Sequence, residues 1–204
     1  MRYTTRWMLA ASVLGLAVSL AAGFGGEKEE TAENPYYKHW ASFKKGTTVV
    51  HVEKTTFGDD AKDELPGGVD EKIIYYKLLR VTDKRAVVEN VVIEKEFLSS
   101  TESAPTRISY PARVNKAYLD AVLLAAGAKR GEETLKVRVN DKEREIKCQT
   151  IEGTRKKKGE EVQQKFWLSR SVPGGIVKRT RRTERDGKLV AETTTLLRRY
   201  RAPE

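Results

Sequence analysis

The sequence contains few of the residues from which metal and redox sites are usually built. Its 204 residues include one cysteine, Cys148, and two histidines, His39 and His51. No His-x-His or His-Glu-x-x-His pattern occurs, so a zinc site lacks ligands. A single cysteine cannot form an internal disulfide, and packing must therefore stabilise the fold. We expect Cys148 to be a buried, inert thiol, because Ile146 and Cys148 would share one face of a predicted strand.

Motifs of catalytic and phosphate-binding sites are also missing. There is no Gly-x-Ser-x-Gly nucleophile elbow. The two Pro-Gly-Gly segments, at residues 66–68 and 173–175, do not lead from a strand into a helix, so neither presents a helix N-terminus to a phosphate. The acids of residues 59–64 lack the spacing of a calcium loop. The sequence therefore predicts a protein without a cofactor or metal. A hydrolase whose site is scattered over several strands, with Cys148 and His51 as a nucleophile pair, is an alternative.

The N-terminus carries the one long apolar run. Arg2 and Arg6 are the only charged residues before Glu27, and residues 7–24 are uncharged. The small residues of positions 21–23 end this run, as they do at the cleavage site of a secretory signal. We therefore predict that the protein is secreted or periplasmic.

The predicted domain organisation follows from this signal. An uncleaved membrane anchor is the alternative, because the uncharged run is at the lower length limit for crossing a bilayer. After cleavage no transmembrane helix is expected. The predicted parts are a signal peptide (1–23), a flexible polar leader (24–38) and a single β-rich domain (39–204).

Positive charge is in excess and is concentrated toward the C-terminus. The chain has 39 Lys and Arg against 29 Asp and Glu, a net charge of +10 that loss of Arg2 and Arg6 would lower by two. If residues 178–182 and 198–201 form paired strands, their cations lie side by side and create a positive field. The candidate polyanion surface comprises Lys178, Arg179, Arg181, Arg182, Arg198, Arg199 and Arg201.

This basic surface has two interpretations. It binds anionic lipid headgroups or acidic polysaccharide, or it is the solvated face of a basic secreted protein. Export and the lack of aromatic residues between the cations argue against chromosomal nucleic acid as the partner.

Alternation of β-branched and polar residues predicts an antiparallel sheet. Asn140-Asp141 and Asp186-Gly187 are hairpin turns in this pattern. Residues 99–111 are expected to contain at most an edge strand, and residues 155–159 a basic loop. The predicted strands cover residues 47–57, 72–82, 85–97, 132–139, 142–151, 162–168, 176–185 and 188–201.

One or two helices complete the predicted fold. Asn115 and Gly127 are suitable start and stop residues for an amphipathic helix over residues 116–126. The aromatic residues of segment 34–43 share a face at helical spacing and predict a short second helix. The fold class is therefore mainly β: a curved antiparallel sheet, a half-barrel or open barrel, with a helix packed on its concave face.

The segment from Phe166 to Lys178 contains Trp-Leu-Ser-Arg-Ser-Val-Pro-Gly-Gly-Ile-Val-Lys, and residues 40–46 contain Trp-Ala-Ser-Phe-Lys-Lys-Gly. This ordering resembles a group of exported bacterial proteins of unknown function. They share a Trp-x-x-Phe-x-x-Gly opening and a Trp-x-Ser/Thr-x-x-Val-Pro-Gly-Gly-Val/Ile-Val-Lys segment. The match covers most of residues 40–200. The architecture is also distantly similar to periplasmic lipoprotein-carrier half-barrels, which implies an apolar or lipidic ligand.

Without that resemblance, a proline followed by two glycines predicts a sharp corner with a tryptophan packed beside it. The residues of this candidate structural turn are Trp167, Pro173, Gly174 and Gly175. We expect a non-catalytic, carrier-like binding protein. The alternative is a basic, envelope-associated binder of polyanions or anionic lipid.

Overall fold

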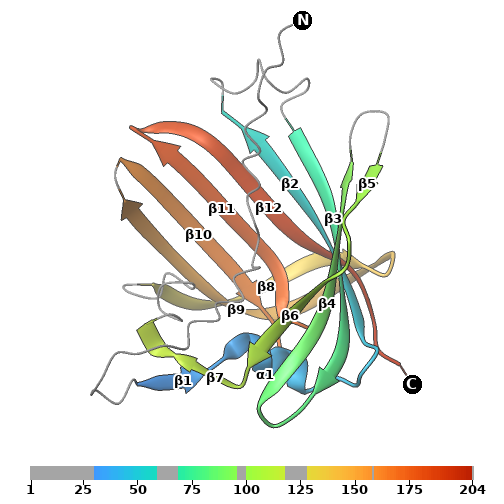
Figure 1. The fold of residues 1–204 in the computed structure, drawn as a ribbon. Helices are drawn as coiled ribbons and strands as arrows, with labels where there is room; N and C mark the ends of the chain where they lie inside the picture. The colour runs from blue at the N-terminus through green and yellow to red at the C-terminus, as the bar shows by residue number, and fades with distance from the viewer. Residues whose placement is uncertain (1–29, 59–68, 96–99, 118–127, 158, 204) are drawn as a thin grey trace, which may run out of the picture.

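The computed structural model describes residues 30–58, 69–95, 100–117, 128–157 and 159–203. Most of them form one antiparallel sheet of ten strands (Figure 1). Its strands are β2 (Thr48–Phe57), β3 (Val69–Val81), β4 (Arg85–Lys95), β5 (Ser100–Glu102), β6 (Thr106–Pro111), β8 (Lys129–Val139), β9 (Lys142–Lys157), β10 (Glu160–Leu168), β11 (Ile176–Arg185) and β12 (Lys188–Arg201). The described residues also contain a helix, α1 (Pro35–Ala41), and a separate pair of strands, β1 (Thr31–Glu33) and β7 (Arg113–Asn115).

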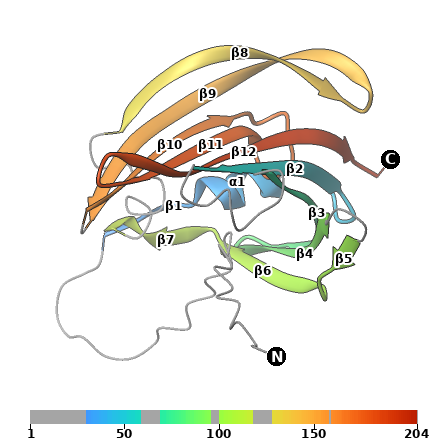
Figure 2. The same cartoon turned by 90° about the horizontal axis from the view of Figure 1, so that it is seen from above.

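The sheet is curved and open. Its strand order is β5-β4-β3-β2-β12-β11-β10-β9-β8, with β6 also paired to β4. In the described residues the two ends of this order do not pair, so the sheet does not close into a barrel. Seen from above, the strands arch around α1, which lies on the concave side (Figure 2). The predicted fold class, a curved antiparallel sheet with a helix on its concave face, is confirmed.

Local sequence signals account for the hairpins. Asn140 and Asp141 both have positive φ, at 53° and 62°, and Asp186 and Gly187 have φ of 51° and 77°. Two consecutive left-handed residues form the turn whose twist matches that of the flanking strands. Both predicted turns therefore connect adjacent strands, β8 to β9 and β11 to β12.

Three segments differ from the sequence predictions. Residues 99–111, expected to contain at most an edge strand, form two strands, β5 and β6, which both pair with β4. The predicted basic loop at residues 155–159 is wrong, because β9 continues to Lys157 and pairs with β10. Lys156 stands opposite Glu161 and forms an ion pair with it (Nζ to Oε2, 2.8 Å), so charge pairing across the strands supports the extension. Residues 31–33, predicted as part of the leader, instead form β1 against β7, a long-range pairing that local composition does not reveal.

The short predicted helix is present as α1. The N–H of Tyr36 donates to the Asn34 side chain (3.0 Å) in an N-cap, and Pro35 occupies the first turn, where its missing N–H costs nothing. The second predicted helix, residues 116–126, lies almost entirely outside the described residues. At its start, the N–H of Ala117 donates to Asn115 Oδ1 (2.8 Å), as expected of a capping asparagine.

Helix α1 packs on one end of the concave face. It contacts β3, β4 and β6, and its Trp40 belongs to a core cluster with Val49, Leu78 and Val88, which are fully buried. The Tyr37 hydroxyl donates to the Thr82 carbonyl (2.8 Å) at the end of β3. This end of the concave face is therefore a packed core.

The corner between β10 and β11 holds α1 in place. Its hydrogen bonds run from Ser169 N–H to the Gly175 carbonyl (2.8 Å) and from Gly175 N–H to the Val172 carbonyl (2.9 Å). Gly174 and Gly175 have φ of 73° and 81°. A Cβ on Gly175 would lie 2.4 Å from His39 Cγ, so this glycine permits the backbone to touch the helix.

Residues 169–175 thus form a sharp corner, and the tryptophan of α1 packs against it. Trp40 of α1 lies against Gly174, where an added Cβ would come within 3.0 Å of its ring. Trp167 instead lies against Lys165 and Lys178, whose ammonium groups are 4.6 and 4.9 Å from its ring centroid. Strand alternation places these three side chains on the convex face, away from α1.

The contact at Gly175 gives a testable stability prediction. Gly175→Ala should destabilise the fold by about 2–5 kcal/mol, because it combines a left-handed backbone with a clash against His39. Gly187→Ala is the matched control, since Gly187 has a similar φ of 77° but nothing within 4 Å of an added Cβ. It should cost only about 1–2 kcal/mol. Chemical denaturation measures both, and equal losses would contradict the role of the α1 contact.

Candidate functional site

The β8–β9 hairpin bends back over the convex face of the sheet (Figure 2). Asn140 at its tip fixes it to β12. The Asn140 N–H donates to the Arg198 carbonyl (3.1 Å), and its side-chain amide exchanges hydrogen bonds with the main chain of Tyr200 (3.1 and 3.2 Å). The hairpin buries Val137 and Cys148 on the face that it turns toward the core. A second packed layer results on the convex side.

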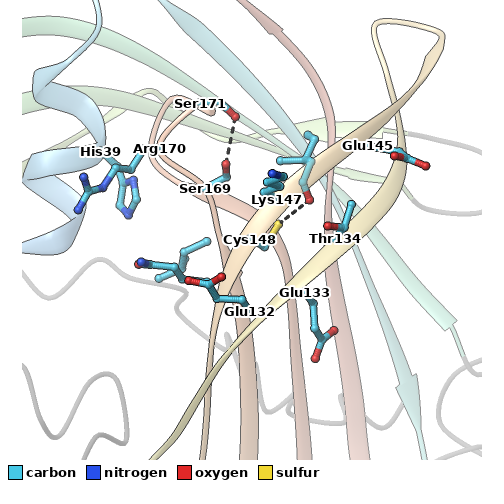
Figure 3. A pocket seen from close by; sticks show the side chains of 13 residues that line it. His39, Glu132, Glu133, Thr134, Glu145, Lys147, Cys148, Ser169, Arg170 and Ser171 are labelled. Carbon is cyan, nitrogen blue, oxygen red and sulfur yellow. Dashed lines mark hydrogen bonds between the residues drawn. The ribbon is translucent and has the colours of Figure 1, made fainter.

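A cleft of about 600 Å³ lies between this hairpin and the corner that follows β10 (Figure 3). Residues 132–134 of β8 and 145–149 of β9 form one wall. Residues 168–171 and His39 of α1 form the other. Four segments that are distant in sequence thus build the site, and none carries a recognisable binding motif.

Two of the acids in the cleft have partners of opposite charge. Glu133 accepts hydrogen bonds from Lys165 Nζ (2.6 Å) and Trp167 Nε1 (2.7 Å), and these bonds hold the pKa of its carboxyl below the ordinary value. Glu145 forms an ion pair with Lys136 (3.5 Å). Glu133 is therefore held by two hydrogen bonds, whereas the Glu145 pair is exposed and weak.

Three charged side chains of the cleft are left without an ion pair in the described part of the chain. They are Glu132, Lys147 and Arg170. Charges of both signs therefore line the cleft, together with the buried Leu168 and Ile146. A bound molecule with complementary groups would satisfy them.

Uncharged polar groups complete the lining. Ser169 Oγ and Ser171 Oγ are hydrogen-bonded to each other at 3.0 Å. His39 is 9% exposed, and its Nδ1 has no hydrogen-bond partner among the described residues. Burial, assisted by the neighbouring Arg170, lowers the pKa of His39, so its imidazole is neutral near pH 7.

The nucleophile pair of the hydrolase hypothesis is not assembled. Cys148 lines the cleft from the core-facing side of the hairpin, and its Sγ donates to the Ile146 carbonyl (3.4 Å). Burial raises the pKa of this thiol to about 11, which keeps it protonated and inert. His51 lies on the concave face, bonded to the Ile176 carbonyl (2.9 Å), and burial lowers its pKa to about 4.

The concave face contains a buried charge network that sequence analysis missed. Arg179 donates to Glu53 Oε2 (2.9 Å) and to Thr195 Oγ1 (3.3 Å), and the Thr195 hydroxyl donates to the same Glu53 oxygen (2.9 Å). The side chains of Arg179 and Glu53 are only 10% and 7% exposed. One signal was available: Glu53 follows Val49 and His51 at strand spacing on the same face.

The predicted polyanion surface is divided between the two faces of the sheet. Arg179 and Arg181 stand opposite Thr195 and Thr193 on the concave side. Alternation places Lys178 and Arg182 on the convex side, and the register shift after Leu197 brings Arg199 and Arg201 level with Val50 and Thr48 on the same side. The remaining cation, Arg198, is the residue without a partner at that shift, and Arg182 pairs with Glu184 (2.7 Å). Paired strands bring the cations together only within each face.

Metal and membrane-spanning features are not found in the described residues. No group of three or more His, Cys, Asp or Glu side chains is placed to hold a metal ion. None of the helices within the described ranges has the length and apolar character needed to cross a bilayer. Comparison with protein-family models, with curated proteins and with solved structures finds no match to this chain.

The concave network gives a second stability prediction. Arg179→Met should cost about 3–5 kcal/mol, because it leaves the Glu53 carboxylate buried without a cation. Arg182→Met on the same strand is the control. Its guanidinium is exposed and paired with Glu184, so its loss should cost under about 1 kcal/mol. Thermal or urea unfolding measures the difference, and a similar cost for both variants would contradict this role of the network.

Proposed function

We propose that the protein is an exported, non-catalytic binding protein that holds a small polar molecule in the cleft between the β8–β9 hairpin and the β10–β11 corner. The observation that supports this most is the set of charges without ion pairs, Arg170, Lys147 and Glu132, in a cleft of about 600 Å³. This volume lies within the range of small-molecule sites, about 300–1,000 Å³.

The lining suggests the chemistry of the ligand. Arg170 and Lys147 suit a carboxylate or another anionic group, and Glu132 suits an ammonium or an amide donor. Leu168 and Ile146 offer contact to a short apolar part. An amino acid or a short peptide carries all three features in one molecule.

The state of the polar groups supports binding rather than catalysis. The raised pKa of Cys148 leaves no thiolate near neutral pH. Ser169 and Ser171 bond to each other, and no hydrogen bond from either hydroxyl to a histidine occurs in the described residues. An activated nucleophile needs such a base within hydrogen-bond distance.

A carrier of lipid in the concave hollow has less support. The apolar half of the concave face is filled, with Val49, Leu78 and Leu197 fully buried beneath α1. Further along the same face, hydroxyl pairs such as Thr55 and Thr193 (3.0 Å) and the Glu53–Arg179 pair replace apolar side chains. A lipid chain would meet polar groups there.

Ligand binding can be tested with a panel of free amino acids, dipeptides and dicarboxylates in a thermal unfolding assay. At a concentration of about 100 Kd, a binding molecule should stabilise the native state by about 2.7 kcal/mol. Arg170→Ala and Lys147→Ala should each weaken binding by about 10-fold to 100-fold, the effect of losing a charged hydrogen bond.

Arg138→Ala is the matched control, because Arg138 is an exposed cation of the same hairpin outside the cleft. Its affinity should equal that of the wild type. If all three variants bind the ligand with equal affinity, the binding site lies outside the cleft. If no member of the panel stabilises the protein, and native mass spectrometry of the purified protein detects no bound small molecule, the proposal is wrong.

Export can be tested by expressing the full chain in a bacterium and measuring the intact mass of the extracytoplasmic protein. We expect a chain that starts at Ala22 or Phe24, after the small residues of the apolar run. Replacing both Ala21 and Gly23 with bulky leucine should block cleavage at Phe24 and leave a longer, membrane-bound form. An uncut chain in the wild type would favour the anchor instead.

A further inference from the structure

The convex face carries an apolar band on three adjacent strands. Cross-strand register aligns Val52, Ile73 and Ile93 in one row. It aligns Val50, Tyr75 and Val91 in the next row of the same face. Alternation directs these six side chains, here called the convex band, away from the concave core, where Val49 and Ile74 point.

The convex band is accessible and lies in the interior of the sheet. Five of its side chains are partly exposed, while Val50 is 8% exposed. The strands β2, β3 and β4 are hydrogen-bonded on both sides, so no strand edge is offered there. The band therefore cannot recruit a partner by strand addition and interacts through its side chains alone.

Cations border the convex band on the side of β12. Arg199 continues the row of Val50 and Tyr75, and the next row contains Arg201 and Lys77 on either side of Thr48. All three cations are exposed and have no ion pair within the described ranges. On the opposite border, Lys54 and Lys95 share Glu71 (3.0 and 2.9 Å). Glu89 stands opposite Lys77 in the same row. With five cations against Glu71 and Glu89, the surface combines an apolar centre with a rim of net positive charge.

We propose that the convex band and its bordering cations dock on an anionic lipid bilayer. Arg199, Arg201 and Lys77 complement the negative headgroups, each adding to the attraction at low salt. The aliphatic side chains enter the boundary between headgroups and acyl chains, where Tyr75 can keep its hydroxyl in the polar layer. This surface is separate from the cleft, so the proposal does not depend on ligand binding.

The composition of the band favours a bilayer over the other partners. A typical interface between two proteins contains about one hydrogen bond for every 100–200 Å². Only the Tyr75 hydroxyl in the band can form one. A two-fold pairing of two copies would place the positive rim against itself or against the Lys54–Glu71–Lys95 group, which has a net positive charge. Electrostatics therefore opposes self-association here.

Vesicle co-sedimentation tests the proposal. A chain that begins at Phe24, and so keeps every described residue, should bind vesicles of phosphatidylcholine with phosphatidylglycerol and should ignore vesicles of phosphatidylcholine alone. Removing two cations, in Arg199→Gln with Arg201→Gln, should weaken binding about fivefold for each, roughly 25-fold in total. Ile73→Thr with Tyr75→Thr should weaken it at least about 10-fold, because two apolar side chains leave the contact.

Two control variants make the same kinds of substitution at residues outside the convex band and its bordering cations. Val69→Thr removes the exposed apolar side chain at the far end of β3, and Lys129→Gln with Arg130→Gln removes two exposed cations of β8. Lipid binding by the apolar control should equal that of the wild type, and the charge control should lose less than threefold. Circular dichroism and unfolding curves verify that each variant is folded.

Three outcomes would overturn the proposal. The first is that the wild type does not bind anionic vesicles, and the second is that the Arg199 and Ile73 variants bind as well as their controls. The third is that sedimentation velocity finds a dimer that Ile73→Thr with Tyr75→Thr dissociates, which would assign the convex band to a second copy of the chain.

Discussion

The pairing of β12 with β2 is the contact on which the remaining structure depends. In the described residues it is the pairing that joins β2–β6 of the N-terminal half to β8–β12 of the C-terminal half. The concave charge network crosses this same junction, because Glu53 is on β2, Thr195 on β12 and Arg179 on β11. A buried pair of this kind adds little net stability but strongly penalises a wrong register. The network thus specifies which residues of the two halves meet.

The register of the β12–β2 pairing also determines which side chains lie on each face of the sheet. The pairing shifts between Leu197 and Arg199, so Leu197 stays in the concave core while Arg199 comes level with Val50 on the convex face. Such a bulge re-aims side chains that strict alternation would place elsewhere. The same irregularity leaves the Arg198 carbonyl free to accept from Asn140, which holds the β8–β9 hairpin over the sheet. One local feature therefore supports both the positive rim and the wall of the cleft.

Sequence analysis predicted the features that local chemistry determines. The Asn140-Asp141 and Asp186-Gly187 turns, the short helix within residues 34–43 and the curved antiparallel sheet all follow from residues close together in the chain. The division of the basic residues between the two faces could also have been predicted, since alternation alone separates Arg179 from Lys178. The β1–β7 pairing was not, because three-residue strands have no periodicity to detect.

The cleft could not be predicted for a different reason. One wall belongs to strands whose sequences only specify a hairpin, and the other combines the β10–β11 corner with His39 of α1. The opening exists because β9 bends so that its first half leaves the plane of β10. The bend is held at a distance, by Asn140 on β12 and by the bond of Glu133 to Trp167. Trp167 therefore positions the wall that carries Glu132 through its hydrogen bond to the neighbouring Glu133. The charged side chains of the cleft, Glu132, Lys147 and Arg170, take no part in these contacts, and none of them forms an ion pair with another described residue.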